Sequence, residues 1–204
     1  MKLHWSPRSP FVRKVMIVAH ELGLADRIDC VRTVVATTRP HVPLMEENPL
    51  SKIPTLVLDD GHTLFDSRVI LEYLDHLAGG GRILPREADA RFAALRLQAL
   101  CDGIMEASLL QVYEARYRPE AVHHQPWLDM QAGKAARGLA ALEASPLTLD
   151  ATPHVGQIAL ACALGYLDLR FKGKWRSTYP KLVAWLDRFA AQVPAFAATK
   201  VEPS

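Results

Sequence analysis

Cysteine is scarce in this chain, and its distribution does not suit a disulfide framework. The 204 residues include three cysteines, Cys30, Cys101 and Cys162, which are odd in number and far apart in the sequence. Small secreted domains that depend on disulfides carry many cysteines, usually in even numbers. The chain is therefore expected to fold without disulfides in a reducing compartment, and a cytoplasmic location is predicted.

An excess of charge of one sign is also missing. Lys and Arg number 24 and Asp and Glu number 22, which leaves a formal net charge of +2 with histidine neutral. Nucleic-acid-binding proteins usually concentrate basic charge on one face, and disordered chains need low hydrophobicity or high net charge. Because half of the residues are hydrophobic, the composition favours a globular protein that does not bind nucleic acid.

No hydrophobic run is long enough to cross a bilayer. The longest, residues 158–167, contains Gly165 and falls short of the roughly 20 residues that a spanning helix needs. Pro7 lies too early for the apolar core of an export signal. The neighbours His123 and His124 have no cysteine or carboxylate at ligand spacing. We therefore expect no membrane segment and no metal site.

Residues 1–78 alternate short extended runs with helical ones, which predicts an α/β domain. Prolines break residues 37–50, which are expected to form a loop with one irregular helix. Asp-Asp-Gly-His at 59–62, between two apolar runs, is a strong hairpin signal. The predicted strands are 2–5, 28–35, 55–58 and 63–65, and the predicted helices are 10–22 and 66–77.

Three consecutive glycines, Gly79 to Gly81, interrupt this pattern and predict a linker over residues 79–86. Beyond it no run reads as a strand, so residues 87–204 are expected to form an all-helical domain of four or five helices. The helix over 154–171 is apolar on nearly every side, which predicts a buried central helix. The other predicted helices are 87–117, 128–144 and one that begins at Pro180.

Three short motifs in the first domain are candidates for binding an anionic ligand. Ser9 precedes Pro10 at a predicted helix start, where a hydroxyl and free N–H groups can hold an anion or simply cap the helix. Pro54 borders a strand, and a cis Ile53–Pro54 bond would turn the backbone of Ile53 toward an extended ligand, although cis bonds are the minority.

The third motif is Asp66-Ser67 at the next helix start. Asp followed by Ser is usually a cap. The same pair can bind the carboxylate and the ammonium of an amino-acid group, because Ser67 donates and Asp66 accepts. Taken alone, the first and third motifs are best explained as helix caps and the second as a proline that begins a strand.

Together, the motifs resemble those of the soluble glutathione S-transferase family. The resemblance rests on Ser-Pro-Phe-Val-Arg-Lys at 9–14, Asn-Pro-Leu-Ser-Lys-Ile-Pro at 48–54, and Asp66-Ser67 followed by Ile-x-Glu-Tyr-Leu at 70–74. It covers essentially the whole chain and implies a bacterial, serine-type member. The implied architecture is a thioredoxin-like N-terminal domain, an all-α helical C-terminal domain and a homodimer.

The resemblance implies roles for individual residues. Ser9 is similar to the catalytic serine, with Ser6 as the alternative, and no tyrosine precedes Tyr73, which excludes the tyrosine-dependent classes. Equivalents that bind the glycyl carboxylate are not identified, although Arg39 and His41 are candidates. The expected glutathione contacts are Lys52, Ile53, Pro54, Asp66 and Ser67, and the expected walls of an electrophile pocket are Trp5, Arg8, Met105, Ser108 and Arg116.

One departure concerns the central helix. The family's Ser/Thr-x-x-Asp capping box is replaced here by His154-Val-Gly-Gln157. Histidine is a poorer cap, so a weaker helix start is expected. Met105 and Trp5 also suit plain core positions as well as they suit a pocket.

The implied activity is conjugation of the glutathione thiolate, as co-substrate, to small apolar electrophiles in detoxification. Two alternatives stay open: a non-catalytic glutathione- or protein-binding member of the same fold, and a glutathione-dependent peroxidase or reductase. A serine at position 9 disfavours the last, because serine does not exchange with disulfides.

Overall fold

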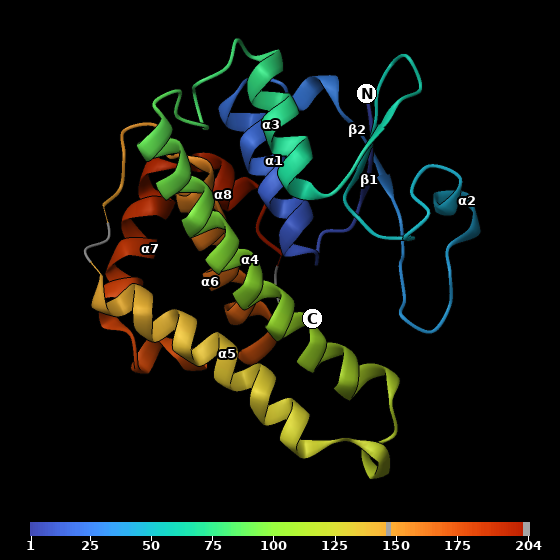
Figure 1. The fold of residues 1–204 in the computed structure, drawn as a ribbon, viewed down its shortest axis with the longest axis vertical. Helices are drawn as coiled ribbons and strands as arrows, with labels where there is room; N and C mark the ends of the chain where they lie inside the picture. Colours follow the sequence, from blue (N-terminus) through green and yellow to red (C-terminus); the bar gives the residue numbers. More distant parts are fainter. Residues whose placement is uncertain (146–147, 202–204) are drawn as a thin grey trace.

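The computed structural model describes residues 1–145 and 148–201 and consists of a small sheet with helices followed by a larger group of helices (Figure 1). The sheet has the strand order β2-β1-β3-β4, with β1 parallel to β2 and antiparallel to β3. Its strands are β1 (Lys2–Trp5), β2 (Asp29–Arg32), β3 (Thr55–Val57) and β4 (Thr63–Leu64).

Helices α1 (Pro10–Glu21), α2 (Val42–Met45) and α3 (Ser67–Leu77), with the 3-10 turn η1 (Ala25–Arg27), complete the first part. This arrangement confirms the predicted α/β class. The chain from Leu58 to His62 makes the predicted hairpin turn, with Leu58 N–H donating to His62 O at 2.8 Å and Gly61 at φ +86°.

The second predicted strand is shorter than expected and ends at Arg32 rather than at residue 35. Its parallel partner β1 ends at Trp5, and the last bond between the two segments runs from Thr33 N–H to Trp5 O at 2.8 Å. Residues 34 and 35 have no partner backbone beside them, so they leave the sheet.

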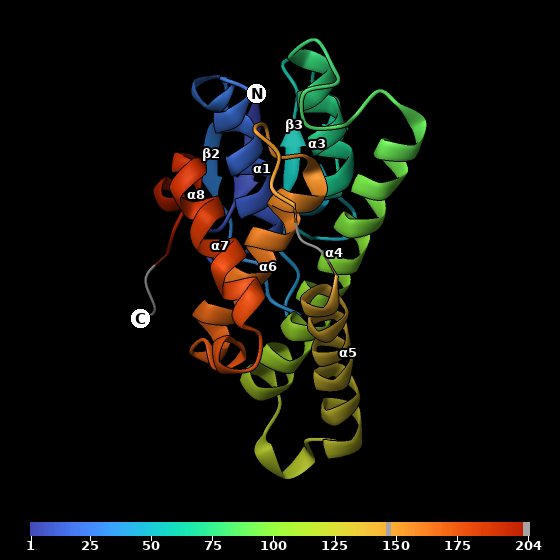
Figure 2. The same cartoon turned by 90° about the vertical axis from the view of Figure 1, so that its left-hand side faces the viewer.

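Helices form the rest of the described chain, as predicted, and Figure 2 shows them extending away from the sheet. The helix predicted at 128 begins at Gln125, because Pro126 fits the first helical turn rather than ending a loop. A short helix after Pro194 was not predicted. These elements are α4 (Ala88–Tyr117), η2 (Glu120–Val122), α5 (Gln125–Ala144), α6 (Val155–Phe171), η3 (Lys174–Ser177), α7 (Pro180–Gln192) and α8 (Pro194–Ala198).

Helix α6 is the buried centre of the helical part, as its uniform apolar sequence predicts. All residues from Val155 to Leu164 are buried. It packs between α4 and the elements that follow it, and it also contacts α1 of the first part. No helix within the described residues combines the length and hydrophobicity of a membrane-spanning segment.

The start of α6 is capped more completely than its sequence suggests. His154 Nδ1 accepts from the N–H groups of Gly156 at 3.1 Å and Gln157 at 3.4 Å, and the Gln157 side chain accepts from His154 N–H at 3.1 Å. This is a full capping box built on an imidazole. The weaker helix start that was expected with histidine at this position is therefore not seen in the hydrogen bonds.

A buried carboxylate joins the two parts of the molecule. Asp102 of α4 accepts from Lys14 Nζ of α1 at 2.6 Å and from Arg68 Nε of α3 at 2.8 Å. Lys14 and Asp102 have exposed side-chain fractions of 0% and 1%. A buried ion pair of this kind fixes geometry because removing either partner leaves an uncompensated charge.

We expect Asp102→Asn to lower the free energy of unfolding by about 3 kcal/mol or more, because it leaves the ammonium of Lys14 buried without a counter-charge. Urea denaturation measures this. Glu72→Gln is the matched control, since it breaks the half-exposed pair between Arg91 and Glu72 and should cost less than about 1 kcal/mol. Equal losses in the two variants would contradict the structural role of Asp102.

The His154 cap predicts a pH dependence of stability. Burial lowers the pKa of His154 below its ordinary value of 6.5, against the opposing charge of Asp150. The unfolded state then binds a proton that the folded state excludes, so stability present above pH 6.5 is lost as the pH falls below it.

Urea denaturation at pH 7.5 and pH 5.5 tests this dependence. His154→Ser keeps a capping box without a titrating group and should remove this part of the loss. His62→Ser, at an exposed histidine of the hairpin, is the control and should retain it. A loss that is identical in all three proteins would rule out His154 as its source.

Candidate functional site

The strand register brings the three sequence motifs to one end of the sheet. His4 lies opposite Thr55, and Leu56 lies opposite Leu64. The segments that follow β1, precede β3 and follow β4 therefore leave the sheet side by side, at the same end of the strands (Figure 1). These segments carry Ser9, Ile53-Pro54 and Asp66-Ser67, which are separated by up to sixty residues in the sequence.

Ser9 is the N-cap of α1. Its hydroxyl accepts from Val12 N–H at 3.3 Å, and Pro10 opens the helix. A hydroxyl carries one donor proton besides its acceptor lone pairs. Ser9 can therefore cap the helix and donate to a ligand atom at once, beside a helix N-terminus that favours negative charge.

The segment that leads into β3 is organised by Asn48, whose exposed fraction is 1%. Its side-chain amide donates to Lys52 O at 3.1 Å and to Thr55 Oγ1 at 2.9 Å, and its Oδ1 accepts from Leu50 N–H at 3.0 Å. These bonds hold both ends of Lys52-Ile53-Pro54. The Ile53–Pro54 bond is cis, as the family resemblance implies.

The irregular segment that carries α2 is tied to the sheet by its acidic residue. Glu47 accepts from the ammonium of Lys2 and bonds the imidazole of His4, whose Nδ1 lies 2.8 Å from Thr33 Oγ1. Burial opposes ionisation of Glu47, but hydrogen bonds from Lys2 and His4 outweigh it and lower its pKa. The carboxylate therefore stays ionised and holds this segment against β1.

Asp66 and Ser67 begin α3. Asp66 is the N-cap, and its Oδ1 accepts from Arg68 N–H at 3.0 Å, while Ser67 is the first helical residue and is buried. Since Arg68 reaches Asp102, the ion pair that joins the two parts of the molecule also fixes this helix start. Hydrogen bonding to Asp102 raises the pKa of Arg68, so the pair stays charged.

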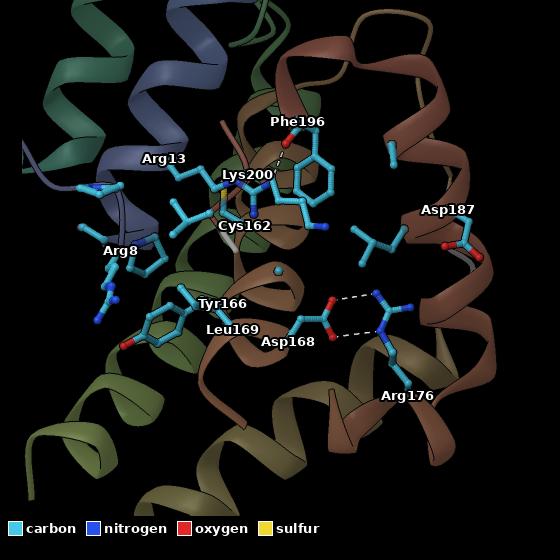
Figure 3. Close-up of a pocket in the computed structure, with 17 residues that line it drawn as sticks. Arg8, Arg13, Cys162, Tyr166, Asp168, Leu169, Arg176, Asp187, Phe196 and Lys200 are labelled. Atoms are coloured by element: carbon cyan, nitrogen blue, oxygen red, sulfur yellow. Dashed lines mark hydrogen bonds and ion pairs between the residues drawn. The ribbon is translucent and has the colours of Figure 1, made fainter. Parts of the chain in front are cut away.

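A cavity of about 320 Å³ opens beside Ser9 (Figure 3). Pro7, Arg8 and Ser9 form one part of its wall, and α6 forms another through Tyr166 and neighbouring residues. The remainder comes from the first turns of α1, from η3, α7 and α8, and from the segment after α8. The size falls at the lower end of ligand pockets, which usually span about 300–1,000 Å³.

Asp168 on the far side of this cavity is fully engaged. Arg176 donates to its two oxygens at 2.9 and 2.7 Å, and Trp175 Nε1 donates at 2.9 Å. Figure 3 draws this pair opposite Arg8 and Tyr166. Arg13 in turn ties the C-terminal segment to α1 by donating to Phe196 O at 2.6 Å.

The structure places only some of the residues predicted to form the pocket at the cavity. Arg8 lines the cavity, whereas Met105 and Ser108 are fully buried, with the Ser108 hydroxyl donating to Ile104 O at 2.7 Å. Both face the core because α6 covers that side of α4, so they offer no surface to a ligand. Trp5 is half-buried and packs against the core, and Arg116 is exposed near the end of α4.

The remaining predicted contacts are exposed, or already take part in hydrogen bonds within the protein. The imidazole of His41 accepts from Leu44 N–H at 3.2 Å and caps α2, while Arg39 is exposed. Ser6 is half-buried and accepts at its carbonyl from Ser9 N–H at 3.2 Å. Lys52 is exposed beside the organised segment.

The thiols inside the helices are not nucleophiles. Cys101 and Cys162 are completely buried, and burial raises the pKa of Cys162 to about 11 and that of Cys101 well above its ordinary value. Both stay protonated at neutral pH, when the thiolate is the reactive form. The prediction that they are apolar core residues is confirmed.

Sequence reasoning missed the part of the cavity wall that comes from the C-terminal half. Tyr166 and Asp168 lie on a helix that reads as a uniform core helix, and Arg176 lies in a turn. Polar residues near the end of an otherwise apolar helix were the available signal.

Comparison with known proteins decides the family. The Glutathione S-transferase, N-terminal domain model matches residues 8–77, and the Glutathione S-transferase, C-terminal domain model matches residues 125–188. The chain is 36% identical, over 83% of each sequence, to the uncharacterized GST-like protein YibF of Escherichia coli K12.

The chain belongs to the glutathione S-transferase family. Solved relatives agree: a family member from Pseudomonas fluorescens Pf-5 with bound glutathione is 43% identical, with a TM-score of 0.92 over 100% of this chain and 98% of that one. A structure from Methylobacillus flagellatus KT with glutathione bound is 36% identical, with a TM-score of 0.84 over 100% and 99%.

A second structure from Pseudomonas fluorescens Pf-5 contains S-(propanoic acid)-glutathione. It is 41% identical to the chain, with a TM-score of 0.87 over 100% of this chain and 99% of that one.

Asn48→Ala tests how the segment that leads into β3 is held in place. Without the amide, Thr55 Oγ1 and Leu50 N–H lose their Asn48 partner and Lys52 O keeps only the Thr55 hydroxyl as its donor, so we expect the free energy of unfolding in urea to fall by about 1–3 kcal/mol. Gln125→Ala removes an amide from an exposed hydrogen bond and should change stability by less than about 0.5 kcal/mol. A neutral Asn48→Ala substitution would contradict this role.

Proposed function

We propose that this protein is a serine-type glutathione transferase that adds the glutathione thiolate to small electrophiles. The proposal rests on one observation: Ser9, Ile53-Pro54 and Asp66-Ser67 lie together at one end of the sheet, next to a cavity that can hold a second substrate. Membership of the family supports glutathione as the ligand.

In this proposal each motif holds one part of the tripeptide. The backbone of Ile53, beside the cis bond to Pro54, pairs with the cysteinyl unit, with Lys52 as a nearby contact. Asp66 receives the ammonium and Ser67 the carboxylate of the γ-glutamyl group, an arrangement supported by their place at the start of α3.

Ser9 then acts on the sulfur. A free thiol has a pKa of about 8.5, so most of it is protonated at neutral pH, although only the thiolate attacks an electrophile. A hydroxyl donor at the N-terminus of α1 favours the anion. Lowering the pKa of the thiol by two pH units corresponds to about 2.7 kcal/mol of preference for the charged form. Serine is a hydrogen-bond donor in this role and forms no covalent intermediate.

The relative from Pseudomonas fluorescens with S-(propanoic acid)-glutathione supports the transferase form of the proposal. In that ligand the sulfur is bonded to a second carbon besides its own cysteinyl carbon, as it is in the product of a conjugation. The cavity beside Ser9 supplies room for such a substituent here.

A homodimer and a cytoplasmic location complete the proposal. Phe92 on α4 and Val69 on α3 are 69% and 46% exposed, and a second copy that covered them would remove their apolar surface from water. The three cysteines are free, which fits a reducing compartment.

Calorimetry with glutathione tests the site residues. We expect Ser67→Ala to weaken binding by about tenfold, because the γ-glutamyl carboxylate loses a donor. Ser9→Ala should leave the affinity nearly unchanged but raise the pKa of the bound thiol, measured by the ultraviolet absorbance of the thiolate. Ser6→Ala is the matched control for the same loop and should change neither.

Activity separates the proposal from its alternatives. Conjugation of aryl halides or epoxides that falls in Ser9→Ala supports the transferase. Glutathione binding without conjugation of any electrophile would favour a non-catalytic member of the fold, and glutathione-dependent reduction of peroxides would favour a peroxidase. If neither Ser9→Ala nor Ser67→Ala changed any of these measurements, the site assignment would be wrong.

A further inference from the structure

Phenols and guanidinium groups gather where α4 and α6 face each other near the cavity. The rings of Tyr113 and Tyr117 lie 5.5 Å apart, Arg116 Cζ lies 5.5 Å from the ring of Tyr117, and Arg170 Cζ lies 5.6 Å from the ring of Tyr166. The charges of Arg170 and Arg116 both act on Tyr113. We call these five residues the tyrosine–arginine cluster.

Two buried polar atoms of this cluster have no hydrogen-bond partner within the described residues. Tyr166 is 3% exposed, and within the described residues neither its buried hydroxyl nor the buried Nε of Arg170 has a partner at hydrogen-bond geometry, although the Arg170 side chain lies close enough to the hydroxyl to act on its pKa. A buried donor without a partner loses its hydrogen bonds to water and gains none in return, which destabilises the folded state. Such groups are rare in native proteins and point to a partner that binds.

The cluster also carries uncompensated positive charge. In residues 1–145 and 148–201, no carboxylate lies within ion-pair distance of the guanidinium of Arg116 or Arg170. By contrast, Arg176 on the far side of the cavity is fully paired with Asp168. Arg170 is only half-buried, and its Cζ lies 5.6 Å from the ring of Tyr166, which lines the cavity.

The cluster supplies donors and keeps them protonated. Burial raises the pKa of Tyr166 to about 12, although the charge of Arg170 acts in the opposite direction. Burial likewise raises the pKa of Tyr113. Both phenols therefore remain O–H donors at neutral pH, next to guanidinium groups that are always charged.

Tyr166 connects the cluster to the reacting centre. Its ring lines the same cavity as Ser9, and Figure 3 draws it on the side of the cavity where Arg8 lies. In the proposed function the sulfur of glutathione is held at Ser9. A group bonded to that sulfur therefore shares the cavity with Tyr166, whose ring lies 5.6 Å from Arg170 Cζ.

We propose that the electrophile carries a carboxylate and that Arg170 and Tyr166 bind it while the neighbouring carbon reacts. The inference rests on the proposed function and names its substrate class. A small apolar body with an anionic end replaces the wholly apolar electrophile expected from the sequence. In a reaction with an aryl fluoride, a sulfur electron pair forms the C–S bond, fluoride leaves with the C–F pair, and the carboxylate is unchanged.

Binding of two product-like ligands tests the proposal without any need for turnover. S-(2-carboxyethyl)glutathione and S-(2-carbamoylethyl)glutathione differ by one charge at the end of the same substituent. We expect calorimetry to give about tenfold or tighter binding of the carboxylate, as hydrogen bonds to a charged group allow. The ratio of the two dissociation constants is measured within each protein, so a partly destabilised variant still reports it.

Variants locate the source of the preference. Arg170→Gln should reduce the ratio to about two or less, Tyr166→Phe should reduce it about threefold, and Arg170→Lys should retain part of it because the charge remains. Arg96→Gln removes an exposed positive charge from α4 outside the cluster and is the control that should keep the full ratio.

Reaction rates give an independent test. The thiol displaces fluoride from 4-fluoro-3-nitrobenzoate and from 4-fluoro-3-nitrobenzamide at the same ring carbon. After correction for the uncatalysed rates, we expect kcat/KM to favour the benzoate about tenfold in the wild type and much less in Arg170→Gln.

The outcomes separate this inference from the proposed function. Equal affinity of the wild type for the two ligands overturns the carboxylate proposal, as does a preference that both Arg170→Gln and Tyr166→Phe leave intact. Those results leave the transferase standing if glutathione binds and neutral electrophiles are conjugated. Failure to bind glutathione at all would instead overturn the proposed function.

Discussion

A single buried carboxylate sets the geometry on which the binding site depends. Asp102 of α4 accepts from Lys14 of α1 and from Arg68 of α3, and Arg68 follows Ser67 directly in the sequence. Desolvation makes such a cluster costly, and its value lies in the arrangement it enforces rather than in net stability. The starts of α1 and α3, which carry the proposed glutathione contacts, are therefore fixed relative to the helical part that completes the cavity.

The site itself shows how ordinary local structure is combined into a binding surface. Ser9 and Asp66 are plain N-caps, and Asn48 is a buried amide that satisfies a loop. Capping leaves the serine proton and the helix N-termini available to an anion. The antiparallel pairing of β3 with both neighbours places these features together, so structural and functional explanations of each residue hold at once.

The two sides of the cavity differ in how far the protein satisfies its own polar groups. Asp168 is bound by Arg176 and Trp175, whereas the Tyr166 hydroxyl and the Arg170 Nε have no partner in the described chain. On the side of Asp168, the carboxylate and its donors satisfy one another and hold α6 to the turn that follows it. The side with Tyr166 and Arg170 keeps unpaired donors and positive charge, so a ligand that supplies an acceptor there gains hydrogen bonds that the folded protein does not make by itself.

Much of this protein was determined by the sequence alone. Apolar periodicity and turn residues placed most elements, because α1, α4 and α6 each depend on neighbours within a few residues, and motif order indicated the family. The end of β2 was missed because a distant partner decided it: the strand stops at Arg32, where its neighbour β1 stops at Trp5. The start of α5 was missed for a local reason, since Pro126 fits the first helical turn instead of ending a loop. Only the tertiary structure decided that α6 covers Met105 and Ser108, and that Tyr166 lines the same cavity as Ser9. Burial and long-range juxtaposition depend on how helices far apart in the chain pack together, and local sequence patterns do not encode that packing.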